Sequence, residues 1–227
     1  MSTSSWSARA YSFFDTLLWM ACLNMLWLAF TVLGLGVLGA GPATAAAQIL
    51  VRKRARGDAA RLLPGFAREY CRNFVRGNAL ALPVMGVAVA LAMNWNYFSG
   101  SRGFLSQLAA AATFVGAIFV AGAVCYLFPM FARYELPLGQ YFLMSSRFAL
   151  RHLAGTVILL FVSAAAVYAS GAVPGLIPFF SIGAWLYLTG WLCDRFFTAN
   201  DDSMAAVTGQ QQAVATGLTH NHALIAR

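Results

Sequence analysis

Histidine and cysteine side chains are the first to consider for chemistry, because they are common metal ligands and nucleophiles. His220 and His222 form a His-x-His pair near the C-terminus, with no third ligand beside them in the sequence, and His152 stands alone. The four cysteines, Cys22, Cys71, Cys125 and Cys193, are far apart, and all but Cys71 lie in apolar runs. This spacing forms neither a Cys-x-x-Cys knuckle nor a disulfide framework. The sequence therefore predicts no metal site, and the cysteines are expected to be small packing residues.

A glycine pattern that resembles a nucleotide-binding fingerprint runs Gly34-Leu-Gly36-Val-Leu-Gly39. The fingerprint requires a preceding β-strand, a βαβ unit and an acidic residue about 20 residues further on. Here the glycines end an uncharged run of 24 residues, 17–40, whose backbone would have to be helical inside a bilayer. We therefore expect a helix break or a close helix approach at these glycines, and no cofactor.

Motifs of the common catalytic sites are missing from the sequence. It contains no His-Glu-x-x-His motif and no Walker loop. The apolar runs carry no charged residue in their middles, where proton-coupled pumps and intramembrane proteases usually need such groups. The prediction is a protein that is not an enzyme.

The composition is typical of a membrane protein. Of the 227 residues, 60% are hydrophobic and only 10% are charged, whereas a soluble domain carries about 25% charged residues. The mean hydropathy is +0.69. The net charge of +8 does not indicate nucleic acid, because the basic residues concentrate between apolar runs. We expect the lipid bilayer as the main partner, and a multi-pass protein of the plasma membrane.

Five apolar runs are long enough to cross a bilayer, so the predicted fold class is all-α, a polytopic bundle of about five transmembrane helices. The predicted spans are 17–40, 78–98, 105–131, 153–173 and 176–193. The loops 51–77 and 133–152 hold most of the arginines, which predicts that both are cytoplasmic, with the N-terminus outside and the C-terminus inside. Residues 1–198 are expected to form one membrane domain, and the polar residues 199–227 a flexible tail.

Two further helices are predicted around the arginine-rich loop. Pro42 fits the first turn of a helix, so a second helical piece is expected from Ala43 to Arg56, leaving the membrane. Residues 58–77 form an amphipathic pattern with an apolar and a basic side. The apolar side holds Leu62, Leu63, Phe66, Tyr70 and Phe74, and the basic side holds Arg61, Arg68, Arg72 and Arg76. This helix either lies on anionic lipid of the inner leaflet or packs on the protein's own helices; the sequence leaves both open.

Polar residues inside and at the ends of the spans are candidates for interaction. Asn24 lies within the first span, so it is expected to face the bundle and bond to another helix. Arg133 with Glu135, and Asp194 with Arg195, are expected to be boundary anchors or a docking surface for a partner. The third span is expected to be central in the bundle, because small residues recur four apart along it: Ala112 and Gly116, and Ala117 and Ala121.

Several short stretches together resemble the YesL-like family of bacterial integral membrane proteins. They are Asn24-Met-Leu-Trp27, Gly41-Pro42-Ala43-Thr44-Ala45, the Arg-Gly-Asp of Arg56 to Asp58, Arg72-Asn73-Phe74, and the block from Tyr126 to Glu135 with Pro129 and Arg133. The resemblance covers roughly residues 11–151, and the Pro-Ala-Thr break after the first span is its more specific signal. Family members are described only as membrane proteins of unknown function, and the resemblance supplies no catalytic residue.

The resemblance also implies genes beside carbohydrate-uptake ABC transporters, so that permease subunits of such a system are the implied partner. The expected function is that of a non-enzymatic accessory protein; the alternative is a small transporter or channel that acts as a homo-oligomer, with the glycine-rich break as a gate. Residues expected to have structural or interaction roles are Asn24, Trp27, Gly41, Pro42, Ala43, Thr44, Arg72, Asn73, Phe74, Pro129, Arg133 and Glu135.

Overall fold

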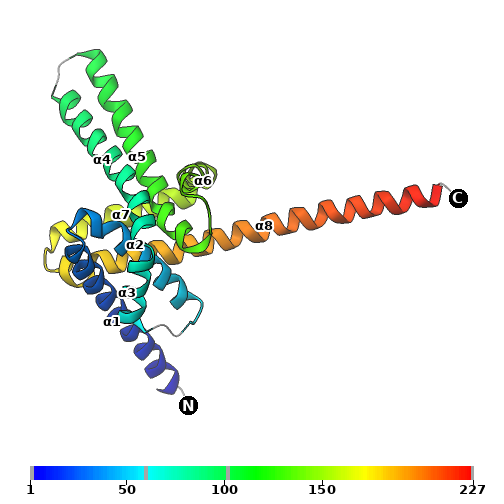
Figure 1. Ribbon diagram of the computed structural model, residues 1–227, viewed down its shortest axis with the longest axis horizontal. Helices are drawn as coiled ribbons and strands as arrows, with labels where there is room; N and C mark the ends of the chain where they lie inside the picture. The colour runs from blue at the N-terminus through cyan, green and yellow to red at the C-terminus, as the bar shows by residue number, and fades with distance from the viewer. Residues whose placement is uncertain (1–2, 59–60, 101–102, 226–227) are drawn as a thin grey trace.

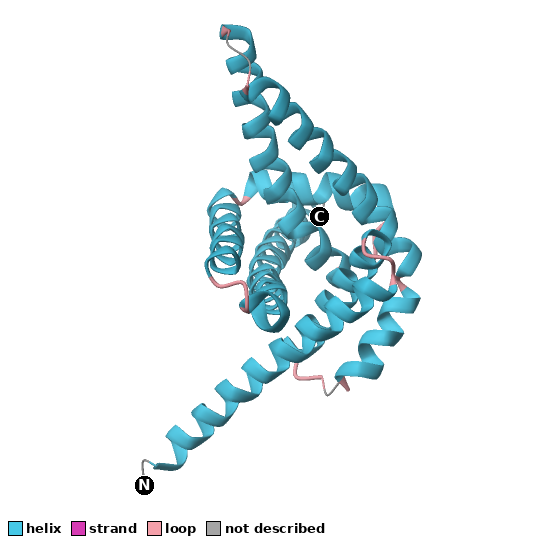
Figure 2. Cartoon of the chain, turned by 90° about the vertical axis from the view of Figure 1, so that its left-hand side faces the viewer, coloured by secondary structure: helices cyan, strands magenta, loops and turns pink. Residues whose placement is uncertain are grey.

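A computed structural model describes residues 3–58, 61–100 and 103–225, and over these residues the protein is helical without a strand. The elements are α1 (Thr3–Leu33), α2 (Val37–Ala55), α3 (Leu62–Arg72), α4 (Phe74–Ser99), α5 (Phe104–Arg133), α6 (Leu138–Arg151), α7 (Leu153–Ala172), the short π-helix η1 (Ile177–Ser181) and α8 (Ile182–Ile225). Figures 1 and 2 show a central bundle from which the α4–α5 hairpin and the N-terminal part of α1 project, and in Figure 1 the C-terminal half of α8 also extends away from it. The predicted all-α class is confirmed.

Helices α1 and α2 form a hairpin around a tight turn. Leu35 and Gly36 have φ angles of 60° and 74°, a region that glycine enters without strain. A Cβ atom on Gly34 would collide with the backbone of Gly39, so the two helices meet too closely for a side chain at this position. The expected break therefore falls at residues 34–36. Pro42 was expected in the first turn of the new helix. It instead lies inside α2, because the glycines have already turned the chain.

In this hairpin, α1 and α2 are joined at the level of Asp15 and Arg54. Oδ2 of Asp15, which lies before the apolar run of α1, is 2.7 Å from Nη2 of Arg54 at the end of α2. The guanidinium of Arg54 also lies over the ring of Trp19, 4.9 Å from its centroid. A single crossing between the N-terminus and the basic loop would instead put Asp15 and Arg54 on opposite sides. Which face of the molecule is cytoplasmic stays a prediction.

The central element of the bundle is α2, which packs against α1, α3, α4, α5 and α8. Ten of its residues are buried: Gly39, Gly41, Pro42, Ala43, Ala45, Ala46, Ala47, Gln48, Leu50 and Val51. Small residues let neighbouring backbones approach, and a Cβ atom on Gly77 of α4 would lie only 2.8 Å from Cα of Pro42. The third span was expected in this central place. In α5, which packs against α2, α4, α6, α7 and α8, the buried residues are Thr113 and a group between Gly122 and Met130, and Ala112 and Ala121 are exposed.

Helix α3 packs on the protein's own helices, which settles the alternative that the amphipathic pattern left open. Phe66 is fully buried and Tyr70 nearly so, and both rings lie about 5 Å from the ring of Phe30 on α1, at 5.1 and 5.0 Å between centroids. Leu63, on the same predicted side, is 59% exposed. Burial of the two aromatic rings therefore positions α3 across the α1–α2 hairpin.

Four helices are long and apolar enough to cross a membrane: residues 9–33 of α1, α4, α5 and α7. They correspond to the first four predicted spans. The fifth predicted span, 176–193, is divided between η1 and the start of α8 and is not among these four helices within the described residues. The two longest candidates, α4 and α5, run side by side as an arm that leaves the bundle (Figures 1 and 2).

Asn24 of α1 bridges to the place where η1 passes into α8. Its side chain is fully buried; Nδ2 donates to the carbonyl of Ile177 at 3.1 Å, and Oδ1 accepts from the backbone N–H groups of Ile182 and Gly183 at 3.0 and 2.8 Å. A π-helical turn leaves backbone groups without their usual helical partners, so the amide of Asn24 satisfies them.

Beyond residue 199, where a flexible tail was expected, the chain continues as helix α8 (Figure 1).

Candidate functional site

A polar cavity of about 580 Å³ lies at the base of the α4–α5 arm, where α4 begins and α5 ends. The end of α2, the junction of α3 with α4, and residues 131–135 form its walls. Its basic lining residues are Arg52, Lys53, Arg56, Arg72, Arg76 and Arg133, and its acidic ones are Asp58, Glu69 and Glu135. Six basic side chains against three acidic ones give the cavity an excess of positive charge.

Glu69 is the buried acid of this cavity. Its side chain is 4% exposed, and its two carboxylate oxygens lie 2.9 Å from Nζ of Lys53 and 2.9 Å from Nη2 of Arg72. Asn73 also donates from Nδ2 to the carboxylate, at 3.3 Å, and to the carbonyl of Glu69, at 3.0 Å. A buried carboxylate is tolerated only with such partners. Glu69 therefore joins the end of α2 to α3 and to the start of α4.

Arg133, the last residue of α5, is bound to two carboxylates of α8. Its Nη1 atom lies 2.7 Å from Oδ1 of Asp194, and Nη2 lies 2.8 Å from Oδ2 of Asp201. The hydroxyl of Tyr134 donates to the same Asp201 carboxylate, 3.0 Å from Oδ1 and 3.1 Å from Oδ2. Burial, and then the Asp201 carboxylate, raise the pKa of Tyr134, so it stays a neutral hydrogen-bond donor at physiological pH. This network docks α8 on the end of α5.

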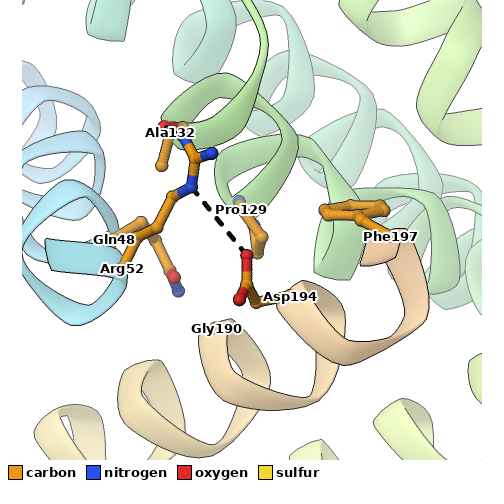
Figure 3. Close-up of a pocket in the computed structure, with 7 residues that line it drawn as sticks. All are labelled: Gln48, Arg52, Pro129, Ala132, Gly190, Asp194 and Phe197. Atoms are coloured by element: carbon orange, nitrogen blue, oxygen red, sulfur yellow. Dashed lines mark hydrogen bonds and ion pairs between the residues drawn. The ribbon is translucent and has the colours of Figure 1, made fainter. Parts of the chain in front are cut away.

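Arg52 of α2 points toward the carboxylate of Asp194 (Figure 3). Its Nη1 atom donates to the carbonyls of Ala132 and Arg133, at 2.7 and 3.1 Å, and so caps the end of α5. Its Nε atom lies 3.8 Å from Oδ1 of Asp194, too far for a hydrogen bond. Burial, and then the charges of Arg56 and Arg133, lower the pKa of Arg52. The surrounding protein therefore does not fully compensate the positive charge of Arg52.

The space between these groups is small. Its residues, all labelled in Figure 3, are Gln48, Arg52, Pro129, Ala132, Gly190, Asp194 and Phe197. The volume is about 10 Å³, the size of a single water molecule. Pro129 forms one wall of this space. A larger ligand would have to bind in the neighbouring 580 Å³ cavity.

The predicted interaction residues divide between two places. Around the α1–α2 hairpin, Nε1 of Trp27 donates to Oγ1 of Thr44 at 3.0 Å, Ala43 is fully buried, and Gly41 and Pro42 contact α4. Asn24 lies on the same hairpin and contacts the region of η1. The second set, Arg72, Asn73, Arg133 and Glu135, lines the basic cavity, with Phe74 beside it against Tyr70.

The charged residues of the two candidate anchors, Arg133 with Glu135 and Asp194 with Arg195, do not pair with each other. Arg133 binds Asp194 and Asp201 and not Glu135, which is exposed. Arg195 does not pair with Asp194; its guanidinium lies 4.0 Å from the ring centroid of Trp191. Asp194 and Arg195 are adjacent on α8 and point in different directions, whereas Glu135 lies beyond the end of α5.

Gln48, Arg52, Glu69 and Asp201 were not recognised as site residues from the sequence. An amide inside an uncharged stretch, as at Gln48, is the same signal that singled out Asn24, and Arg52 follows one turn later on the same face. Asp194, Thr198 and Asp201 recur at helical spacing, which could have indicated that the helix continues into the predicted tail. All three contact Arg133.

Metal binding has no support within the part of the chain whose side chains are described, where no three His, Cys, Asp or Glu residues lie together. His220 and His222 lie on α8, and their side chains fall outside the description. The positions of the basic residues are therefore the main chemical feature of the described surface.

Over the residues that the structure describes, fold and site define an all-helical protein with four potential membrane-spanning helices and a basic cavity at the base of two of them. The chain belongs to the family described as "Protein of unknown function, DUF624", whose profile matches residues 20–95. It is similar to YesV of Bacillus subtilis (strain 168), with 32% identity over 162 residues that cover 71% of this chain and 78% of YesV. It is also similar to YteU of the same organism, with 31% identity over 180 residues that cover 79% of this chain and 81% of YteU.

Both relatives carry the description of an uncharacterized protein, which confirms the expected membership of a family of unknown function. No solved structure matches the chain.

Proposed function

We propose that this chain is a non-enzymatic integral protein of the plasma membrane that acts as an accessory partner of a carbohydrate ABC transport system. The resemblance to YesL-like proteins supplies the kind of partner, because it implies genes beside carbohydrate-uptake transporters. That part of the proposal rests on analogy. The mode of association rests on the α4–α5 arm.

The arm is the observation that carries the proposal. Between α4 and α5 lies a cleft of about 630 Å³ with an almost wholly apolar lining, which includes Ala88, Ala92, Trp95, Ala117 and Ala121. Its alanines recur four apart on both helices, a spacing that lets another helix approach closely within a membrane. We infer that a transmembrane helix of a permease subunit packs into this cleft.

Affinity purification from the native membrane in mild detergent, with mass spectrometry of the co-purified proteins, tests the proposal. We expect permease subunits of a carbohydrate importer in stoichiometric amount. Ala92→Trp fills the cleft and should lower their recovery at least tenfold. Ala90→Trp is the matched control, because Ala90 lies two residues earlier on α4 and does not line the cleft; its recovery should equal that of the wild type.

Recovery of the chain alone, as a homo-oligomer that carries sugars or ions in liposomes, would contradict the accessory role. It would favour the alternative function of a small transporter or channel. Equal loss of permease with both tryptophan variants would remove the cleft from the proposal, since the effect would then come from bulk on α4 and not from the filled space.

A further inference from the structure

The basic cavity at the base of the arm contains positive charge that the protein does not neutralise. Glu69 is shared between Lys53 and Arg72, and Arg133 is bound to carboxylates of α8. Arg56 and Arg76 also line the cavity, both are exposed, and neither forms an ion pair with another described residue. Two cationic side chains thus face the same space without an ion pair, and the lining acids Asp58 and Glu135, also without ion pairs to described residues, leave the lining with six basic against three acidic side chains.

Arg52 adds a third cation whose charge is poorly compensated. Its buried Nε–H group donates to no hydrogen-bond partner, and Oδ1 of Asp194 lies 3.8 Å away and is shared with Arg133. Arg56 and Arg133 also repel it, because like charges in a partly buried site interact strongly. An anion in the cavity would relieve this repulsion.

We propose that this cavity binds a phosphate group, carried either by a lipid headgroup or by a small soluble phosphate. Arginine forms paired hydrogen bonds with the oxygens of phosphate, and a cluster of guanidinium groups is the usual protein site for it. The cavity lies where α4 begins at Phe74 and α5 ends at Arg133, the level at which two candidate spans meet polar chain. A phospholipid headgroup would lie at this depth. The site goes beyond the accessory role and does not depend on it.

The test uses the full-length protein in a neutral detergent. Titration calorimetry with inorganic phosphate measures binding of the free anion, and native mass spectrometry with dioleoyl phosphatidic acid or dioleoyl phosphatidylcholine measures retention of lipid. We expect saturable phosphate binding, or preferential retention of phosphatidic acid, by the wild type. The double variant Arg56→Gln/Arg76→Gln should weaken that binding at least tenfold, and each single variant should weaken it by a smaller factor.

The matched control is Arg68→Gln/Arg147→Gln, which removes the same charge from two exposed arginines that do not line the cavity. The affinity of this control variant for phosphate, and its retention of phosphatidic acid, should stay within twofold of the wild type. Binding of phosphate alone would identify a soluble phosphate as the ligand, and retention of phosphatidic acid alone would identify a lipid. Absence of both, or an equal loss in the two double variants, would overturn the proposal. Co-purification with a permease does not enter this test, so the two proposals can fail separately.

Discussion

At the scale of single residues, the polar side chains of this protein act as links between helices. Asn24 satisfies backbone groups of η1 and α8, Arg52 caps α5, and Glu69 joins α2 to α3 and α4. Each of these groups is buried or half-buried, where an unpaired donor or acceptor costs about 1–3 kcal/mol. They therefore determine which helix ends meet, beyond what apolar contact alone would select.

Glu69→Gln tests this linking role. The amide loses the charge that binds Lys53 and Arg72, so we expect destabilisation of about 1–3 kcal/mol, reduced toward the lower end because both cations are well exposed and can be rehydrated. Thermal unfolding of the detergent-solubilised protein should show a lower Tm.

Glu135→Gln removes the same charge from an exposed acid of the same cavity. The effect of this control on stability should be within about 0.5 kcal/mol. A Tm for Glu69→Gln as high as that of Glu135→Gln would show that the buried carboxylate contributes nothing to stability.

At the scale of elements, the bundle depends on how closely α4 can approach α2. A Cβ atom at Gly77 would lie 2.8 Å from Cα and 2.9 Å from N of Pro42, both backbone atoms that cannot move aside alone. The small residues of α2 thus do what the small residues of α5 were expected to do. Whether small residues allow close packing depends on which helix lies against them. The spacing of residues along one helix does not identify that neighbour.

Gly77→Ala should force α4 away from α2 and destabilise the protein by about 1–3 kcal/mol through overpacking. Gly86→Ala, on the same helix, is the control: a Cβ atom there meets nothing within 4 Å. Since alanine is the better helix former, the control should be neutral or stabilising by up to about 1 kcal/mol. Yields and thermal unfolding in detergent measure both variants, and equal behaviour of the two would refute the close contact.

At the scale of the whole molecule, the α1–α2 hairpin bears on how the chain is threaded through a membrane. The ion pair between Asp15 and Arg54 puts the beginning of the apolar run of α1 and the end of α2 at one level. Arg133 and Asp194 are joined to Arg52 at the same end of α2. The basic residues of several segments therefore gather on one face, as the positive-inside rule requires of a cytoplasmic face.

This arrangement predicts that Ser12 and Arg61 are accessible from the same side of the membrane. In a background without Cys22 and Cys71, Ser12→Cys and Arg61→Cys should both react with a membrane-impermeant maleimide only after cells are permeabilised. Gly103→Cys, at the tip of the α4–α5 arm, should react in intact cells and serves as the control. Labelling of Ser12→Cys in intact cells, with Arg61→Cys protected, would restore the predicted N-terminus outside.

Much of the secondary structure could be predicted from the sequence, because helix length and hydropathy are local properties of the chain. The predicted spans 78–98, 105–131 and 153–173 lie within or almost within α4, α5 and α7. The prediction for Pro42 was wrong because a glycine turn precedes the proline, and the sequence did not indicate that the partners of Arg133 are Asp194 and Asp201. The turn before Pro42 and the choice of partners for Arg133 both depend on the direction of backbone and side chains in space.

By itself, the sequence determined that the chain is helical, that it has apolar helices of membrane-spanning length, and that its basic residues lie between them. These properties follow from hydrophobic length and charge, which a single segment carries alone. Only the tertiary structure decided that α2 is the central helix and that arginines from α2, α3, α4 and α5 share one cavity. The physical reason is that close packing depends on shape complementarity between segments far apart in the chain, and the charges meet wherever that packing brings the helix ends together.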